Sequence, residues 1–143
     1  MSVVYSGGTY DLLHIGHIEL LRASRELAGP HGKVVVALNG DDFVERFKGR
    51  RPVCTWSERR AVLEATKYVD LVVANVDDED SKPSIEVIRP DIIIGGSDWD
   101  APSYKIQMDM SDEWLGRMGI ELVFIPRTTG VSTSLLRTRA QPG

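Results

Sequence analysis

The sequence has little cysteine, no long apolar run and no excess of positive charge. Its single cysteine, Cys54, excludes an internal disulfide, and no Cys/His cluster has the spacing of a zinc site. Seventeen basic and 21 acidic residues give a net charge of -4, which argues against non-specific binding to nucleic acid. No apolar run approaches the roughly 18 residues of a membrane span. We therefore expect neither nucleic acid nor a membrane as a partner.

The N-terminal residues lack the basic stretch and apolar run of a signal peptide, so the sequence predicts a cytoplasmic protein. The length of 143 residues, of which 42% are apolar, suits one domain over residues 1–143 with a substantial core.

Five short apolar segments predict buried strands: Val3–Tyr5, Lys33–Leu38, Leu71–Val76, Ile92–Ile94 and Leu122–Ile125. Helical patterns lie between them. Strands and helices in alternation predict an α/β fold, a doubly wound five-stranded parallel sheet in a single domain. Ligands of such sheets bind at the carboxyl ends of the strands, so we expect the chemistry in the segments that follow the strands.

The helical patterns have recognisable starts and stops. Thr55 and Glu58 form a capping-box pattern, and the helix that they open is expected to reach about Tyr68 with Val62, Leu63 and Ala65 facing inward. The basic stretch Arg46–Pro52 before it is predicted to be a loop. Further helices are expected from near His17 to Leu27, over Ser84–Ile88, over Tyr104–Met118 and from Ser132 onward.

The segment after the first strand predicts a phosphate site. The backbone N–H groups of Gly7 and Gly8 and the hydroxyl of Thr9 suit an anion, and the missing side chain of Gly16 allows a close approach at a helix start. His14 and His17 stand three residues apart on that first turn, so both imidazoles can face one point. A plain strand-to-helix turn with two surface histidines is the weaker interpretation. The spacing fits neither a P-loop nor a dinucleotide fingerprint.

The segment after the fifth strand predicts a second anion-binding helix start. Ser132 is a good N-cap, and Arg127 is a bidentate donor for phosphate. Taken alone, this segment is equally well a capped terminal helix, but the first motif favours the site interpretation.

Together the two motifs resemble those of the cytidylyltransferase family of nucleotidyltransferases, and its glycerol-3-phosphate branch most of all. The resemblance is carried by Gly8-Thr9-Tyr10-Asp11, by His14-Ile15-Gly16-His17 and by Arg127-Thr128-Thr129-Gly130-Val131-Ser132-Thr133. It runs from about Val3 to Leu136 and implies a Rossmann-like nucleotidyltransferase fold.

The resemblance also implies roles for the matching residues. The catalytic groups would be His14, His17, Lys48 and Arg127. The nucleotide would be bound by Gly7, Gly8, Thr9, Tyr10, Asp11, Gly16, Gly96, Asp98, Trp99, Arg127, Thr128, Ser132 and Thr133. The acceptor would be bound, on a weaker match, by Arg50, Arg59 and Lys67. No residue is assigned as a metal ligand; Mg²⁺ would arrive on the triphosphate, with Asp11 assisting it.

The implied activity is that of an enzyme that transfers CMP from CTP to a phosphomonoester such as glycerol 3-phosphate and releases pyrophosphate. The implied partners are these two small molecules and a second copy of the chain in a homodimer. Two alternatives stay open: an adenylyltransferase that uses ATP with a sugar phosphate or flavin mononucleotide, and a non-catalytic nucleotide-binding domain. The acceptor is open because the segment Ala101–Gly119, which departs from the family pattern, lies near where the acceptor should sit. Departures at Lys67, Ser97 and Thr129 keep the non-catalytic alternative open.

Overall fold

The computed structural model describes residues 2–75, 82–96, 110–126, 128 and 130–141. The strands are β1 (Val3–Gly8), β2 (Lys33–Leu38), β3 (Leu71–Ala74), β4 (Ile92–Gly96) and β5 (Glu121–Ile125). The helices are α1 (Ile15–Ala28), α2 (Asp41–Lys48), α3 (Trp56–Ala65), α4 (Lys82–Ile88), α6 (Asp112–Met118) and α7 (Thr133–Ala140).

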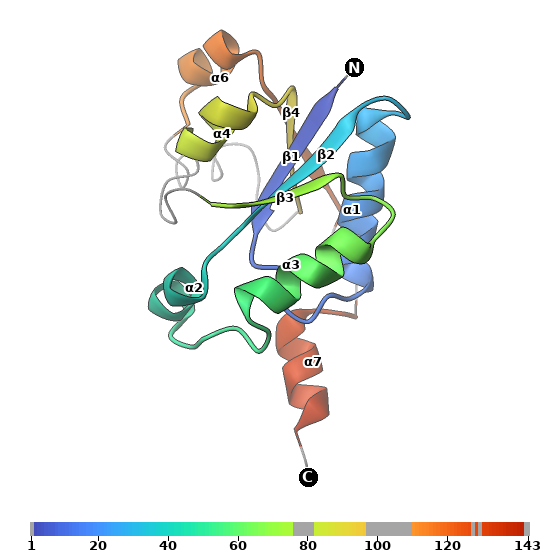
Figure 1. The fold of residues 1–143 in the computed structure, drawn as a ribbon, viewed down its shortest axis with the longest axis vertical. Helices are drawn as coiled ribbons and strands as arrows, with labels where there is room; N and C mark the ends of the chain where they lie inside the picture. Colours follow the sequence, from blue (N-terminus) through green and yellow to red (C-terminus); the bar gives the residue numbers. More distant parts are fainter. Residues whose placement is uncertain (1, 76–81, 97–109, 127, 129, 142–143) are drawn as a thin grey trace.

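The five strands form one parallel sheet in the order β3-β2-β1-β4-β5 (Figure 1). The chain runs outward from β1 through β2 to β3 and then returns to place β4 on the other side of β1. This reversal puts the switch point between β1 and β4, where doubly wound sheets bind their ligands. The predicted fold class is confirmed.

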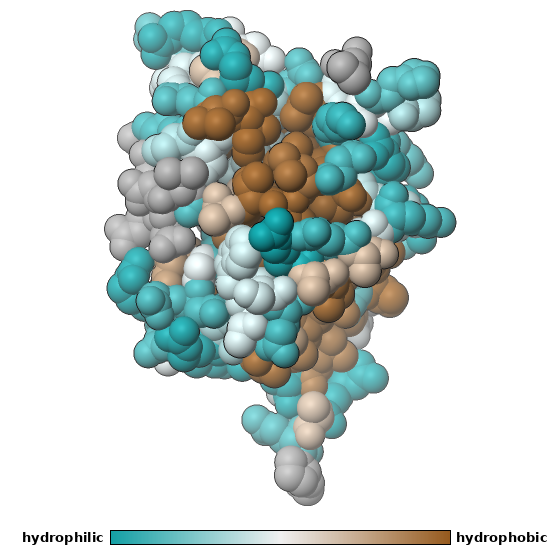
Figure 2. All heavy atoms as spheres, viewed as in Figure 1, coloured by the Kyte–Doolittle hydropathy of each residue, from teal (hydrophilic) through white to brown (hydrophobic). Residues whose placement is uncertain are grey.

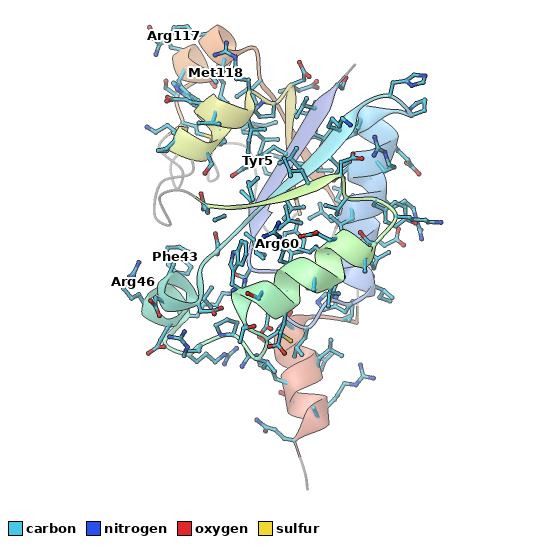
Figure 3. All side chains as sticks on the ribbon, in the orientation of Figure 1. Tyr5, Phe43, Arg46, Arg60, Arg117 and Met118 are labelled. Atoms are coloured by element: carbon cyan, nitrogen blue, oxygen red, sulfur yellow. The ribbon has the colours of Figure 1, made fainter. Side chains whose placement is uncertain are left out.

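Apolar side chains cover both faces of the sheet. On one face, Leu21 of α1 and Leu63 of α3 pack against Val36 of β2. On the other face, Ile85 of α4 and Leu115 of α6 pack in a cluster with Tyr5, which Figure 3 labels near the middle of the sheet. Burial on both faces explains why the strands read as continuous apolar runs in the sequence.

The capping box at Thr55 is confirmed, but the helix that it opens is shorter than predicted. Thr55 accepts a hydrogen bond from the Glu58 amide, and the Glu58 side chain accepts one from the Thr55 amide. Helix α3 ends at Ala65 because the amide and hydroxyl of Thr66 both bond to the Leu63 carbonyl oxygen. Leu63 is buried as predicted, whereas Val62 and Ala65 are exposed, so their inward assignment was wrong.

The basic stretch predicted as a loop begins inside a helix. Helix α2 carries Asp41 and Asp42 in its first turn and Arg46 and Lys48 in its last turn, so its charges complement the helix dipole. It ends at Gly49, whose left-handed backbone (φ 77°) suits glycine. Figure 3 shows Arg46 on the outer side of α2. The loop prediction was wrong because this short helix is mostly charged and buries a single residue, Val44.

The remaining helices agree with prediction except at their ends. Helix α1 begins at Ile15 rather than near His17, and α7 begins directly after Ser132, as expected. Of the helix predicted over Tyr104–Met118, the described part forms α6 from Asp112. Residues 104–109 lie outside the described residues.

The helices of the described ranges are too short or too polar to cross a membrane.

Candidate active site

The turn between β1 and α1 has an unusual backbone. Tyr10 (φ 51°) and Leu12 (φ 48°) both lie in the left-handed region. For residues other than glycine this conformation costs on the order of 1–3 kcal/mol each and persists only where the surroundings fix it. The fixing group is Asp11, between the two.

The Asp11 carboxylate is buried and fully engaged within the protein. Its oxygens accept hydrogen bonds from the amides of Val53 (2.7 Å) and Cys54 (2.9 Å) and an ion pair from Arg137 of α7 (2.8 Å). Burial alone would raise the pKa of Asp11, but the two amides and the Arg137 guanidinium together hold that pKa below its usual value. The carboxylate is therefore a structural clasp, which corrects the expectation that it helps to hold Mg²⁺.

Tyr10 also faces inward. Its ring lies in the core cluster beside Leu38, and its hydroxyl lies 2.7 Å from that of Ser6. Burial raises the pKa of Tyr10 to about 12, although the Ser6 hydrogen bond opposes the shift. A Cβ on Gly8 would lie 3.1 Å from this ring, so the ring would have to shift slightly to accommodate a side chain there. The expectation that the Tyr10 side chain contacts the nucleotide is corrected.

The two histidines of the first motif form the N-terminus of α1. His14 is the N-cap, and its Nδ1 accepts a hydrogen bond from the Gly16 amide (3.1 Å). The Nδ1 atom of His17 accepts one from the His14 amide (3.2 Å), and the rings stack with centroids 3.9 Å apart. A nitrogen that accepts carries no proton, so each neutral ring bears its proton on Nε2. The helix start thus presents two Nε2–H donors side by side.

The electrostatic surroundings of His17 favour the neutral ring. Burial, followed by the charges of His14 and Lys48, lowers the pKa of His17 to about 4, with Asp11 opposing. Lys48, at the end of α2, is therefore close enough for its charge to act on His17. The structure brings these two predicted catalytic residues together.

The start of α7 lies against the start of α1. A side chain at Gly16 would meet the His14 ring at 2.9 Å and Val131 at 3.5 Å. Ser132 caps α7 by accepting a hydrogen bond from the Leu135 amide (3.0 Å), and the Thr133 hydroxyl donates to the Asp11 carbonyl (2.8 Å). Two helix N-termini, with the positive ends of their dipoles, therefore converge beside the histidines.

Other predicted nucleotide residues lie at the same edge of the sheet. Gly8 ends β1, and Gly96 ends the neighbouring strand β4. Thr9 directly follows β1, and Thr128 is half-buried. Arg127, Asp98 and Trp99 lie outside the described residues.

Two predicted acceptor-binding residues are elsewhere. Arg59 is 2% exposed, and its guanidinium bonds to the carbonyls of Cys54 and Thr9 and to the Asp41 carboxylate. It supports the turn from inside and offers no cation to an acceptor. Lys67 lies at the opposite, amino-terminal edge of the sheet, because the loop that contains it leads into β3 and bonds to Val34 at the start of β2. The acceptor roles of both residues are corrected.

The third predicted acceptor residue, Arg50, lies on the site's side of the molecule. It is exposed and lines a cavity of about 580 Å³ between the loop after α2 and helix α7. Leu12, Val53 and Arg137 also line this cavity. The neighbouring Arg51 is paired with Asp42 and Glu45 at the surface.

The sequence analysis missed two groups that shape the site. Arg137 clasps Asp11 across 126 positions of sequence, a contact that no local pattern reveals. Asn39 follows β2 at the ligand-binding edge, and its Nδ2 lies 3.4 Å from the Thr9 hydroxyl oxygen. Its place after a strand was the signal that could have found it.

The described residues offer no built site for a metal ion. Among them, no group of three or more His, Cys, Asp or Glu side chains is placed to hold one. Asp11 is committed to its own partners.

A family model described as "Cytidylyltransferase-like" matches residues 5–139, almost the whole chain. The chain belongs to this family. It is 32% identical over 137 residues to the glycerol-3-phosphate cytidylyltransferase of Staphylococcus aureus, covering 96% of this chain and 93% of the relative. These matches confirm two predictions made from the sequence: the family, and that the protein is a nucleotidyltransferase enzyme.

Relatives with other names are about equally similar. The chain is 33% identical over 138 residues to the FAD synthase of Korarchaeum cryptofilum, covering 95% of this chain and 89% of that protein. It is 37% identical over 142 residues to the bifunctional protein HldE of Azorhizobium caulinodans, covering 99% of this chain but 28% of HldE. Among solved structures, a lipopolysaccharide core biosynthesis protein from Thermoplasma volcanium superposes with a TM-score of 0.72 at 28% identity, over 90% of this chain and 98% of that one.

The Asp11 clasp predicts a pH-dependent loss of stability on substitution. Asp11→Asn removes a buried charge from its partners and should lower the free energy of unfolding by about 3–5 kcal/mol at pH 7. Because the folded pKa of Asp11 is depressed, its contribution is complete above the unfolded value of about 3.9 and is lost as pH falls through the folded pKa. Urea titrations should show that the difference in free energy of unfolding between wild type and Asp11→Asn is smaller at pH 3 than at pH 7. The exposed Asp42→Asn is the control and should change little; a pH-independent loss contradicts the clasp.

The histidine geometry predicts an NMR signature. His17 should titrate with a midpoint near pH 4, far below the ordinary value of about 6.5. At pH 7, long-range ¹H–¹⁵N spectra should show His14 and His17 both with the proton on Nε2. A His31→Ala variant removes the third histidine and simplifies assignment. A proton on Nδ1 of either ring would rule out the hydrogen bonds described above.

Proposed function

We propose that the protein transfers CMP from CTP to a phosphomonoester acceptor such as glycerol 3-phosphate and releases pyrophosphate. The observation that carries this proposal is the pair of Nε2–H donors of His14 and His17, held at the point where the N-termini of α1 and α7 converge. This arrangement suits a phosphate on which negative charge increases.

In the proposed reaction an oxygen of the acceptor phosphate attacks the α-phosphorus of CTP. A new P–O bond forms, and the bond from the α-phosphorus to the bridging oxygen breaks, with its electron pair leaving on pyrophosphate. Charge builds on the five-coordinate α-phosphate, where fixed donors stabilise the transition state more than the ground state. His14 and His17 are the donors in the right place, and little covalent chemistry is asked of the protein.

The leaving pyrophosphate would be held by groups around the histidines. Lys48 brings a positive charge, and the start of α7 brings the Ser132 hydroxyl together with the backbone N–H groups of Thr133 and its neighbours. Arg127, which precedes this helix in the sequence, is the further cation that the family resemblance implies. The Gly8 amide and the Thr9 hydroxyl would contact the phosphates, and Gly96, Asp98 and Trp99 the nucleoside.

The acceptor is proposed to enter beside Arg50. The cavity of about 580 Å³ near this residue opens between α7 and the loop after α2. The exposed guanidinium of Arg50 at its wall suits an anionic phosphomonoester. The glycerol-3-phosphate cytidylyltransferase relative supports this choice of nucleotide and acceptor.

One alternative has support of its own. The FAD synthase relative is as similar as the cytidylyltransferase, so adenylyl transfer from ATP to flavin mononucleotide or a sugar phosphate is the second candidate.

A second copy of the chain is the proposed partner. Figure 2 shows apolar side chains over the middle of the face that carries the edge strand β3. Leu71 of β3, Val62 of α3 and Val87 of α4 are among the exposed apolar residues. An edge strand with apolar neighbours suits burial in a homodimer.

The experiment that tests the function is a matrix of nucleotides against acceptors. Pyrophosphate release is measured with CTP or ATP, each with glycerol 3-phosphate, a sugar phosphate and flavin mononucleotide, in the presence of Mg²⁺. Release with CTP and glycerol 3-phosphate is the expected result. Release with ATP alone supports the adenylyl alternative, and nucleotide binding without release under any condition indicates a non-catalytic domain.

Replacing the histidines should reduce turnover more than nucleotide affinity. His14→Ala and His17→Ala each remove a donor whose hydrogen bond strengthens as charge builds on phosphorus, which should lower kcat about 10²–10³-fold. The exposed His31, the third histidine of the chain, is the matched control, and His31→Ala should retain wild-type kcat. Because His14 also caps α1, kcat is compared well below the melting temperature of each variant. Near-normal kcat in either variant contradicts the assignment.

A further inference from the structure

A series of hydrogen bonds runs along the carboxyl edge of the sheet behind Thr9. The Ser84 hydroxyl of α4 donates to the Asn75 side-chain carbonyl (3.2 Å). The Asn75 amide donates to the side-chain carbonyl of Asn39 (3.2 Å), and the Asn39 amide donates to the Thr9 hydroxyl oxygen (3.4 Å). These two asparagines are the only ones in the sequence. We call Ser84, Asn75 and Asn39 the amide network.

The backbone holds the amide network in place. Asn39 directly follows β2, and its backbone amide donates to the Gly8 carbonyl at 2.9 Å. Asn75 directly follows β3, and its backbone amide donates to the Leu38 carbonyl at 3.2 Å. Ser84 is 2% exposed and Asn75 8% exposed, so neither is placed to touch a nucleotide directly. Among the described residues, the hydrogen bonds that join Asn75 and Ser84 to Thr9 pass through Asn39.

The direction of these hydrogen bonds determines whether the Thr9 hydroxyl has a proton to donate to a phosphate. A primary amide donates only from its nitrogen and accepts only at its oxygen, so the orientation of one amide determines that of the next. With Ser84 donating at one end, the nitrogen of Asn39 faces Thr9, and the Thr9 oxygen accepts. The Thr9 proton then points away from Asn39. With the opposite direction, Thr9 would donate to Asn39 and have no proton for a phosphate.

We propose that Ser84, Asn75 and Asn39 are positioning residues that orient the Thr9 hydroxyl as a hydrogen-bond donor to the nucleotide phosphates. This inference rests on the proposed function, because Thr9 is one of its phosphate-contacting groups. A donor aligned before the substrate binds needs no reorganisation during the reaction, which is the condition for effective stabilisation of developing charge.

The test reverses the direction without removing the side chain. In Asn75→Asp the carboxylate cannot donate, so the Asn39 amide must turn its nitrogen toward residue 75 and its oxygen toward Thr9. The Thr9 proton is then drawn inward. A hydrogen bond to a charged phosphate is lost, so kcat/KM for the nucleotide should fall about 10- to 100-fold.

A double-mutant cycle separates orientation from general damage. Thr9→Val removes the hydroxyl and should itself lower kcat/KM. In the Thr9→Val background, Asn75→Asp should cause little further loss, because no hydroxyl remains to be turned. An equal loss in both backgrounds shows that Asn75 acts through structure alone and overturns the proposal. So does an unchanged kcat/KM in Asn75→Asp.

A milder pair of variants covers the case in which Asn75→Asp fails to fold. Ser84→Ala removes the donor to the Asn75 side-chain carbonyl and with it one hydrogen bond that favours this direction, so it should lower kcat/KM several-fold in the wild-type background and not in Thr9→Val. Ser24→Ala is the matched control: Ser24 is 1% exposed on α1, and its hydroxyl bonds to the Leu20 carbonyl away from the site. No difference between Ser84→Ala and Ser24→Ala overturns the proposal.

The same variants distinguish failure of this inference from failure of the proposed function. Affinity for CTP and ATP is measured by calorimetry on every member of the cycle, with turnover measured for the nucleotide that gives pyrophosphate. If wild type turns over but Thr9 and Asn75 are not coupled, the positioning role is wrong and the function stands. If no nucleotide is turned over, the proposed function is wrong. Coupling between Thr9 and Asn75 in nucleotide affinity then still tests the positioning role.

Discussion

The buried carboxylate of Asp11 is the interaction on which the candidate site depends. It joins three segments that are distant in sequence: the turn after β1, the loop at Val53 and Cys54, and helix α7 through Arg137. A buried charge is tolerated only where it is paired and hydrogen-bonded, and here every partner comes from an element of the site. Tyr10 and Leu12, on either side of Asp11, both have left-handed backbones. Such strain persists only where the surroundings fix it, and the contacts of Asp11 supply that fixation.

The histidines show how one set of hydrogen bonds serves both folding and chemistry. The amides of Gly16 and His14 need acceptors because the first turn of a helix leaves its N–H groups unpaired. The imidazole Nδ1 atoms satisfy them, and this use of Nδ1 leaves the proton on Nε2. An aspartate in these places would cap the helix equally well but, as an ionised carboxylate, would leave no donor for a phosphate. The choice of histidine for a capping position is therefore the strongest local sign of function in the sequence.

Much of this could be predicted from the sequence where the cause is local. The buried strands, the Thr55 capping box and the Ser132 cap each depend on neighbours within a few residues, and they are confirmed. The errors concern side chains whose destination is set by distant segments. Arg59 reads as a surface cation, yet it is buried against Thr9 and Asp41, and Lys67 was assigned to the site although its loop lies at the other edge of the sheet. Pattern alone does not reveal which end of a strand a basic residue will reach.

Helix α7 is held on the protein by polar contacts rather than by a buried apolar face. All of its residues are described, and none of its side chains is buried, so an apolar core does not hold it in place. Two polar contacts reach Asp11 instead, the Arg137 ion pair and the Thr133 hydroxyl. An anion bound between the starts of α1 and α7 would add contacts to both helices and so favour the docked state by mass action. Because Asp11 also holds the strained turn, one carboxylate fixes both the turn after β1 and the start of α7, and its loss should loosen the two together.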